Sequence, residues 1–149
     1  MIFVTVGTTM PFDELIQKID EGVGAGLIKD EVVCQIGPGA YKPVYCGFFS
    51  FKPTLAEEIE AASMVVAHGG TGSVLSLIAA RKRFLAVCNP NADGDHQNQF
   101  LRRLSREVEF SWTADLDNVI DAIREARCPQ AWAAEHGHLA RDILNFIGG

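Results

Sequence analysis

The fold is decided by one stretch of the sequence, Met64-Val65-Val66-Ala67-His68-Gly69-Gly70-Thr71-Gly72-Ser73-Val74-Leu75. Its leading apolar residues predict a buried strand, residues 68–73 predict a glycine-rich turn, and the chain from Val74 onward predicts a helix. A strand, a glycine-rich turn and a helix N-terminus together present backbone N–H groups that bind phosphate. The glycines carry no Cβ atom that would hold a ligand away from this backbone. The stretch therefore predicts a diphosphate-binding turn, to which Thr71 or Ser73 adds a hydroxyl donor.

The same pattern also fits a tight turn that binds nothing. It is not a Walker loop, because no Gly-Lys-Ser/Thr follows, and its G-G-x-G spacing differs from the G-x-G-x-x-G of dinucleotide-binding proteins. His68 either forms structural hydrogen bonds or faces the ligand. Ser73 lacks the G-x-S-x-G context of a hydrolase nucleophile.

Length and composition are those of one soluble domain. The chain has 149 residues, of which 48% are hydrophobic and 21% charged, enough for one domain with a core. The net charge of −6 disfavours nucleic acid as a partner. We expect a cytoplasmic protein, because no apolar run reaches the roughly 18 residues of a membrane span and the N-terminus does not resemble a signal peptide.

The cysteines predict neither a disulfide framework nor a metal site. They are Cys34, Cys46, Cys88 and Cys128, and no two of them form a C-x-x-C pair. The first three lie in apolar segments and are expected to be reduced packing residues. A site built from Asp93, Asp95 and His96 would lack a second histidine at helical spacing, so we expect no metal and no cofactor.

Strand-like and helical segments alternate along the chain. Predicted strands cover residues 2–6, 31–36, 44–48, 64–67, 84–88 and 108–110. Predicted helices begin near Phe12, at a Thr54–Glu57 capping box, at Val74, at Asp95 as N-cap, near Leu116 and, for a last helix of about 130–147, after Pro129. This alternation predicts a single α/β domain over residues 1–149, with a mostly parallel, Rossmann-like sheet covered by helices on both faces.

Four polar or glycine-rich segments follow predicted strands, where α/β sheets bind their ligands. They are Gly7-Thr8-Thr9, the loop at Gly47–Ser50, the glycine-rich turn, and the segment from Asn89 to Gln99. Their convergence predicts nucleotide binding. Within the last segment, Asp95-His96-Gln97-Asn98-Gln99 offers amides at a helix start, which suit either sugar hydroxyls or simple solvation.

Three motifs in order carry a resemblance to a known family. They are Met-Ile-Phe-Val-Thr-Val-Gly-Thr-Thr-x-Pro-Phe-Asp at the N-terminus, His-Gly-Gly-Thr-Gly-Ser at 68–73, and Asp-His-Gln-x-Gln at 95–99. Together they resemble the C-terminal, donor-binding domain of family 28 glycosyltransferases, which is half of a two-lobed GT-B enzyme. The length resembles the stand-alone form of that domain, the small subunit of two-part enzymes. Such enzymes include bacterial exopolysaccharide glucuronosyltransferases and the N-acetylglucosaminyltransferase of dolichol-linked oligosaccharide synthesis.

The resemblance implies roles for individual residues. The donor diphosphate would be bound by His68, Gly69, Gly70, Thr71, Gly72 and Ser73. Uracil and ribose would be bound by Gly47, Phe48, Phe49, Ser50 and Ser76; the donor sugar by Asp95, His96, Gln97 and Gln99; and Gly7, Thr8 and Thr9 would face the acceptor. Ser76 departs from the family, whose members carry an acidic residue near this position.

The resemblance also implies the reaction. We expect a donor-binding subunit of an inverting, metal-independent enzyme that moves a sugar from a UDP-sugar to a lipid-linked acceptor. The other lobe, on a membrane-associated Rossmann-like partner chain, would supply the catalytic base, with His68 the candidate on this chain. The partner would hold the complex at the inner face of the membrane. The alternatives are a non-catalytic nucleotide-binding or scaffold subunit, which Ser76 favours, and a nucleotide-sugar epimerase.

Overall fold

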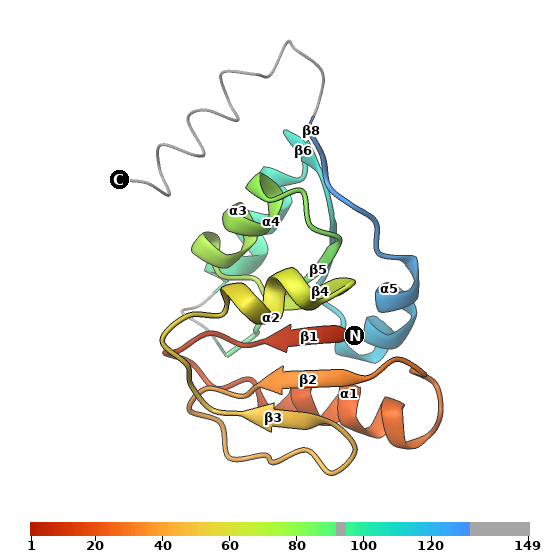
Figure 1. Ribbon diagram of the computed structural model, residues 1–149. Coiled ribbons are helices and arrows are strands. Elements are labelled where there is room, and N and C mark those ends of the chain that lie inside the picture. Colours follow the sequence, from red (N-terminus) through yellow and green to blue (C-terminus); the bar gives the residue numbers. More distant parts are fainter. Residues whose placement is uncertain (92–94, 132–149) are drawn as a thin grey trace.

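The computed structural model describes residues 1–91 and 95–131. Its elements, in chain order, are β1 (Ile2–Thr5), α1 (Asp13–Gly24), β2 (Val32–Gln35), β3 (Gly47–Phe49), α2 (Ala56–Ala61), β4 (Met64–His68), α3 (Thr71–Ala79), β5 (Phe84–Val87), α4 (His96–Leu104), β6 (Val108–Glu109), β7 (Ser111–Thr113), a 3₁₀ turn η1 (Leu116–Asn118), α5 (Val119–Glu125) and β8 (Gln130–Ala131). Helices lie on both faces of the sheet, with α2 in front and α1 behind in Figure 1.

Within residues 1–91 and 95–131, the main sheet has six strands in the order β3-β2-β1-β4-β5-β7, and every neighbouring pair is parallel. The order runs outward in both directions from β1 and β4, as in the doubly wound dinucleotide-binding fold. Connections from β1 and β4 therefore leave in opposite directions and open a crevice at the carboxyl ends of these two strands. The predicted Rossmann-like α/β fold is confirmed.

Each central strand is buried on both faces. Alternate side chains point to opposite sides of a strand, so Val4 and Val66 pack toward α1 and α5. Phe3 and Val65 pack toward α2, α3 and α4. The near-continuous apolar runs that predicted these strands follow from this double burial.

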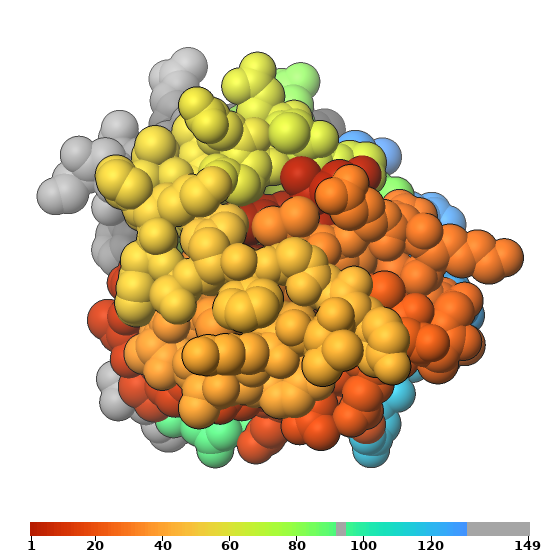
Figure 2. All heavy atoms as spheres, turned by 60° about the horizontal axis from the view of Figure 1, so that its bottom comes forward, coloured from red at the N-terminus to blue at the C-terminus, as the bar shows by residue number. Residues whose placement is uncertain are grey.

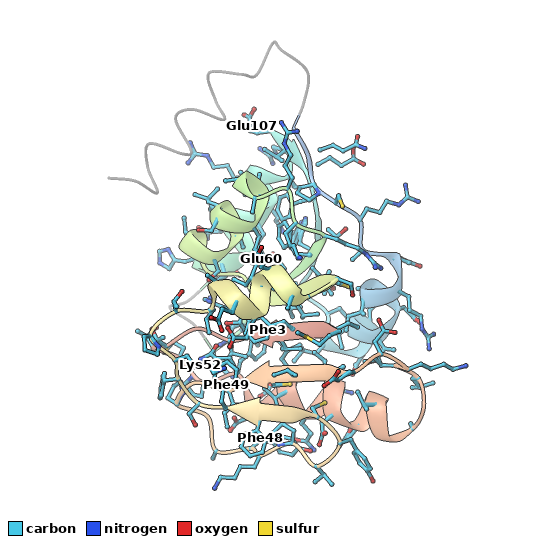
Figure 3. The ribbon with its side chains drawn as sticks, in the orientation of Figure 1. Phe3, Phe48, Phe49, Lys52, Glu60 and Glu107 are labelled. Carbon is cyan, nitrogen blue, oxygen red and sulfur yellow. The ribbon has the colours of Figure 1, made fainter. Side chains whose placement is uncertain are left out.

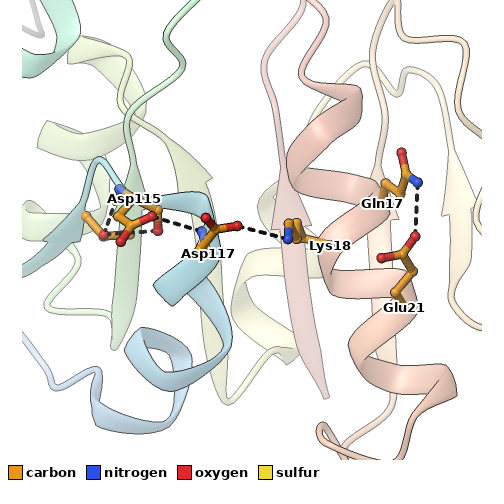
Figure 4. Close-up of polar contacts among 6 residues, drawn as sticks. Gln17, Lys18, Glu21, Asp115 and Asp117 are labelled. Carbon is orange, nitrogen blue, oxygen red and sulfur yellow. Dashed lines mark hydrogen bonds and ion pairs between the residues drawn. The ribbon is translucent and has the colours of Figure 1, made fainter.

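On the α1 side, an ion pair adds to the apolar packing between α1 and η1. Lys18 Nζ lies 3.1 Å from Asp117 Oδ1 (Figure 4), and Asp117 N donates to Asp115 Oδ1. Within α1, Gln17 Nε2 donates to Glu21 Oε1. Because both groups of the ion pair are exposed, we assign it less than about 1 kcal/mol.

Two predicted strands are displaced in the structure. The strand predicted at 44–48 is β3, which begins at Gly47, because the N–H groups of Val44 and Tyr45 donate to Asp20 instead of a neighbouring strand. The strand predicted at 108–110 is β6, which pairs antiparallel with β8 outside the main sheet. The sixth position of the main sheet is filled by β7, whose Ser-Trp-Thr sequence gives no apolar run.

Helix starts also differ from the predictions. Helix α3 begins at Thr71, so the second half of the glycine-rich turn is the first turn of the helix. Helix α2 begins at Ala56, with Leu55 as its N-cap, and the hydroxyl of Thr54 accepts from Ala56 N instead of forming a capping box. Asp95 is the N-cap of α4, but its carboxylate accepts from Asn98 Nδ2 and not from a backbone amide.

The remaining sequence expectations are mixed in outcome. Cys34, Cys46 and Cys88 are buried, as predicted, and Cys128 is exposed. None of the helices in the described part of the chain is long and apolar enough to cross a membrane. The last helix was predicted to begin near residue 130, but Gln130 and Ala131 form strand β8. The rest of that predicted helix, with its apolar face Leu139, Ile143, Phe146 and Ile147, lies outside the described residues, as does Asp93.

Candidate functional site

The N-terminus of α3 lies between two clefts at the carboxyl ends of the strands. The His68 cleft, of about 270 Å³, is lined by Val6, Thr9, Met10, His68, Gly69, Gly70, Thr71, His96, Gln97 and Phe100. The Ser76 cleft, of about 380 Å³, is lined by Thr5, Leu55, Ile59, Gly72, Ser73, Ser76 and Leu77. Since residues of the first turn of α3 line both clefts, a ligand that crosses this turn would reach into each of them.

The first turn of α3 has the features of an anion site. Gly70, its N-cap, has no side chain that could accept from the amides of Thr71, Gly72 and Ser73. Those amides and the helix dipole favour negative charge at this end of the helix. A Cβ built on Gly72 would meet nothing within 4 Å, so the helix end is open on that side.

His68 is held inside the glycine-rich turn by both ring nitrogens. Gly70 N donates to His68 Nδ1 at 3.2 Å, and His68 Nε2 lies 3.3 Å from Ser73 Oγ. A backbone N–H only donates, so Nδ1 carries the lone pair and Nε2 carries the proton. Burial lowers the pKa of His68 and keeps the ring neutral. This arrangement leaves no free lone pair on the ring and favours a role in shaping the turn over one as catalytic base.

Two glycines make room for the His68 ring. A Cβ at Gly7, which has a φ of +84°, would lie 2.8 Å from His68 Nε2. A Cβ at Gly70 would collide with the same ring. The glycines at 7 and 70 thus make room for the His68 ring, and the glycine at 72 leaves the first turn of α3 open. Gly69 lies against Gln97, where an added Cβ would be 3.0 Å from Oε1.

The predicted sugar-binding residues are divided between two environments. His96 and Gln97 line the His68 cleft, whereas Asp95 and Gln99 are exposed and are not among the described residues lining it. Gln97 Oε1 accepts from Asn89 N at 2.8 Å. Its carbonyl is therefore engaged within the chain, and its NH₂ group remains as the donor that a ligand could meet.

Asn89, which the sequence did not single out, holds this segment in place. It is 2% exposed, its Nδ2 donates to Pro11 O at 3.1 Å, and its Oδ1 accepts from Asn91 N at 3.0 Å. The loop after β5 is thereby joined to the loop after β1. The sequence feature that could have pointed to Asn89 is its position as a polar residue directly after an apolar strand.

The predicted nucleoside segment, Gly47–Ser50, lies on and just after the edge strand β3. Phe49 points inward and stacks on Phe3 with ring centroids 6.2 Å apart, and Lys52 Nζ lies 4.4 Å from the Phe49 ring (Figure 3). Phe48 points away from the sheet and is 42% exposed. Of the predicted acceptor-side residues, Thr9 lines the His68 cleft, Gly7 touches its histidine, and Thr8 is exposed.

Backbone amides are the main source of positive potential at the site. Among the described residues that line the two clefts, none is a lysine or an arginine. Within the same described part of the chain, no three His, Cys, Asp or Glu side chains gather closely enough to hold a metal ion. A diphosphate bound here would be neutralised by this chain through the α3 amides and the hydroxyls beside them.

A third hollow, of about 370 Å³, lies at the amino-terminal ends of the strands, where Ile2 and Met64 form part of its lining. Its arginines serve the fold: Arg83 Nε donates to Ala126 O, and Arg124 donates to Leu27 O, each at 2.7 Å. These carbonyls lie just beyond helix ends, where cations are favourable.

The chain is similar in sequence to two curated subunits of the same name. Human UDP-N-acetylglucosamine transferase subunit ALG13 is 30% identical over 117 residues, which cover 71% of this chain and 10% of the human protein. The subunit of the same name from Yarrowia lipolytica is 30% identical over 134 residues, covering 80% of this chain and 67% of that protein. The chain thus spans about a tenth of the human relative's length.

Two solved structures share the fold. The solution structure of ALG13 matches 99% of this chain and 96% of its own length with a TM-score of 0.56 at 18% identity. The crystal structure of the glycotransferase of kitacinnamycin matches 99% of this chain and 38% of its own length with a TM-score of 0.55, also at 18% identity. Residues 1–131 match the family described as glycosyltransferase family 28 C-terminal domain. The chain therefore belongs to the C-terminal domain family of glycosyltransferase family 28.

Proposed function

We propose that this chain is the donor-binding subunit of a glycosyltransferase that uses a UDP-sugar. The observation that carries the proposal is the uncapped first turn of α3, which is open at Gly72 and lies between the two clefts. Membership of the family and similarity to subunits named for UDP-N-acetylglucosamine transfer support the substrate class.

In this proposal the nucleotide crosses the N-terminus of α3. The diphosphate accepts from the amides of Thr71, Gly72 and Ser73, the nucleoside extends toward the Ser76 cleft and the Gly47–Ser50 segment, and the sugar occupies the His68 cleft near His96 and Gln97. Ser76 offers one hydroxyl to the ribose. Asp95 and Gln99, both exposed, would reach the sugar only through a change of side-chain conformation.

The chemistry follows from this placement. An acceptor hydroxyl attacks C1 of the sugar, the bond from C1 to the diphosphate oxygen breaks with inversion, and UDP leaves with the bonding electron pair. Negative charge grows on the diphosphate in the transition state, where the preorganised α3 amides stabilise it. No step of this mechanism is assigned to a metal ion.

The catalytic base belongs to the partner in this proposal. Both nitrogens of His68 are engaged within the turn, so the proton of the acceptor hydroxyl is taken by a group on a second Rossmann-like chain. That membrane-associated chain would also bind the lipid-linked acceptor. The isolated chain is therefore expected to bind UDP and to transfer no sugar, and transfer is expected once the partner is co-expressed.

Substitutions at Gly72 test the diphosphate site without disturbing the fold. Both Gly72→Asp and Gly72→Asn place a side chain where an added Cβ meets nothing within 4 Å. A carboxylate in the first turn of a helix is favourable by about 0.3–1 kcal/mol, so Gly72→Asp should unfold at the same temperature or a higher one. The same carboxylate repels a diphosphate. We expect Gly72→Asp to bind UDP at least about tenfold more weakly than its neutral isostere, measured by titration calorimetry.

Two results of the UDP titrations would contradict the proposal. If Gly72→Asp binds UDP as tightly as Gly72→Asn, the diphosphate does not lie on the α3 N-terminus. If the wild-type chain gives no binding heat with millimolar UDP, the donor-binding function itself is wrong.

A further inference from the structure

Gln35, the last residue of β2, is a buried polar side chain with four hydrogen bonds. It is 1% exposed. Its Oε1 accepts from Thr5 Oγ1 at 2.7 Å and from Val6 N at 3.2 Å. Its Nε2 donates to the carbonyl oxygens of Gly7 at 3.1 Å and Ser50 at 3.0 Å. These bonds use both donors and both lone pairs of the amide.

The orientation of this amide is fixed by its partners. Val6 N–H can only donate, and the two carbonyl oxygens can only accept, so the oxygen and nitrogen of Gln35 cannot exchange places. A glutamate of the same shape would bring a carboxylate oxygen against two carbonyl oxygens. The position therefore requires a side chain that both donates and accepts.

The four bonds join the carboxyl ends of three neighbouring strands, β1, β2 and β3. Ser50 O also accepts from Gly37 N at 3.1 Å, so both lone pairs of this carbonyl are engaged and the peptide that follows Ser50 is held in one orientation. Gly37, with a φ of +58°, lies so close to Gly7 O that an added Cβ would collide with it.

We propose that Gln35 is a positioning residue for the nucleoside of the donor. It fixes the Gly7 loop, whose neighbours Val6 and Thr9 line the His68 cleft, relative to the Gly47–Ser50 segment, toward which the proposed function extends the nucleoside. A binding surface that is already ordered loses less entropy when a ligand binds. Gln35 acts from beneath the site and touches no ligand. This inference rests on the proposed function, because it concerns the affinity for UDP.

Titration calorimetry on the whole chain with two ligands, UDP and inorganic pyrophosphate, tests the role of Gln35. Pyrophosphate needs only the first turn of α3, which Gln35 does not contact, whereas UDP also needs the nucleoside segment. We expect Gln35→Glu to weaken UDP binding about tenfold and to leave pyrophosphate binding within about twofold of wild type. In amide NMR spectra of the ligand-free variant, the signals of Gly7, Ser50 and Phe51 should move more than those of residues 71–73.

A matched control and a milder variant accompany this test. Asp20→Asn weakens the support at the other end of β3, where Asp20 binds the N–H groups of Val44 and Tyr45, and should leave UDP affinity unchanged. Should Gln35→Glu fail to fold, Thr5→Val removes one of the four bonds, at a residue that is 4% exposed. Because Thr5 also lines the Ser76 cleft, movement of the Gly7 and Ser50 amide signals in the ligand-free variant must accompany its effect on affinity. This variant should weaken UDP binding about two- to threefold while sparing pyrophosphate.

Two results would overturn the inference. One is unchanged UDP affinity in the folded Gln35→Glu or Thr5→Val variant, which leaves the proposed function intact. The other is an equal loss of UDP and pyrophosphate binding, which would indicate general damage. A wild-type chain that binds neither ligand would instead overturn the proposed function.

Discussion

At the scale of single residues, His68 shows how a histidine beside a ligand site can serve the backbone. Its neutral ring accepts from Gly70 N and lies against Gly7, so it sets the curvature of the glycine-rich turn. The sequence predicted that His68 would lie at this turn. It left open whether the ring forms structural hydrogen bonds or faces the ligand, because the partners depend on the ring folding back toward Gly70.

This role predicts a pH dependence of stability. Burial lowers the pKa of His68 in the folded chain below the ordinary value of 6.5. The unfolded chain then binds more protons below about pH 6.5, so the contribution of His68 to stability is complete above that pH and falls as the pH drops toward the folded pKa. Thermal unfolding between about pH 5 and pH 8 should show this loss.

The His68→Asn variant tests whether the pH dependence of stability comes from the His68 ring. Asparagine keeps an oxygen that can accept from Gly70 N but has no group that titrates in this range, and it loses the bond to Ser73. We expect it to be about 1 kcal/mol less stable than wild type at about pH 8, and the gap should narrow as the pH falls. A gap that stays constant with pH would contradict the assignment of a neutral ring.

At the scale of elements, the loop before β3 is held to α1 by one carboxylate. Asp20 is 1% exposed and accepts from Tyr41 Oη at 2.7 Å, Val44 N at 2.9 Å and Tyr45 N at 2.7 Å. Burial raises the pKa of Asp20, but the hydrogen bonds together outweigh it and lower the pKa below 3.8. The same contact raises the pKa of Tyr41 to about 12.

Replacing this carboxylate has a spectroscopic consequence. In Asp20→Asn the charge that opposes ionisation of Tyr41 is gone, so the tyrosine absorbance that appears late in an alkaline titration of wild type should appear at lower pH. The variant should also be less stable by about 2–4 kcal/mol, because charge-assisted bonds to a buried carboxylate are lost. An unchanged titration would show that Tyr41 does not bind Asp20 in solution.

Elements are predictable from sequence where their own side chains decide them. Apolar runs predicted β1, β4 and β5, and helical spacing of Leu15, Ile16 and Ile19 predicted α1. These predictions were correct because burial of one or both faces of an element fixes where its apolar residues lie. The start of β3 was wrong, since it depends on Asp20, which lies 24 residues before Val44. The strand β7 was missed because its Ser-Trp-Thr sequence carries no apolar run.

The candidate site was predictable to a similar degree. Glycine spacing placed the turn at the start of α3 and strand ends placed the loops around it. The hydrogen bonds of Gln35 could not be predicted, since they require β2 to lie between β1 and β3. A polar residue within an apolar strand indicates only that Gln35 needs hydrogen-bond partners, and does not identify them.

At the scale of the whole molecule, burial falls from the centre of the sheet to its edge. The middle strands β1, β4 and β5 are covered on both faces by helices. At the edge, β3 and the segment around it, which face the viewer in Figure 2, expose Val44, Tyr45, Phe48 and Phe51. Helix α2 has no buried residue among its six, all of which the structure describes. It is nevertheless flanked by Leu55 and contributes Ile59 to the Ser76 cleft.

This gradient predicts how amide hydrogen exchange should respond to a ligand. In the ligand-free chain, amides of β4 should exchange slowest and those of α2 fastest among the helices, because local opening of α2 exposes little apolar surface. Bound UDP would contact the Ser76 cleft and oppose that opening. We therefore expect UDP to slow exchange in residues 55–59 and 71–76 by at least about tenfold and to leave β4 unchanged. Pyrophosphate, which lacks the nucleoside, should slow residues 71–73 alone. Equal protection of α2 by the two ligands would mean that the nucleoside does not occupy the Ser76 cleft.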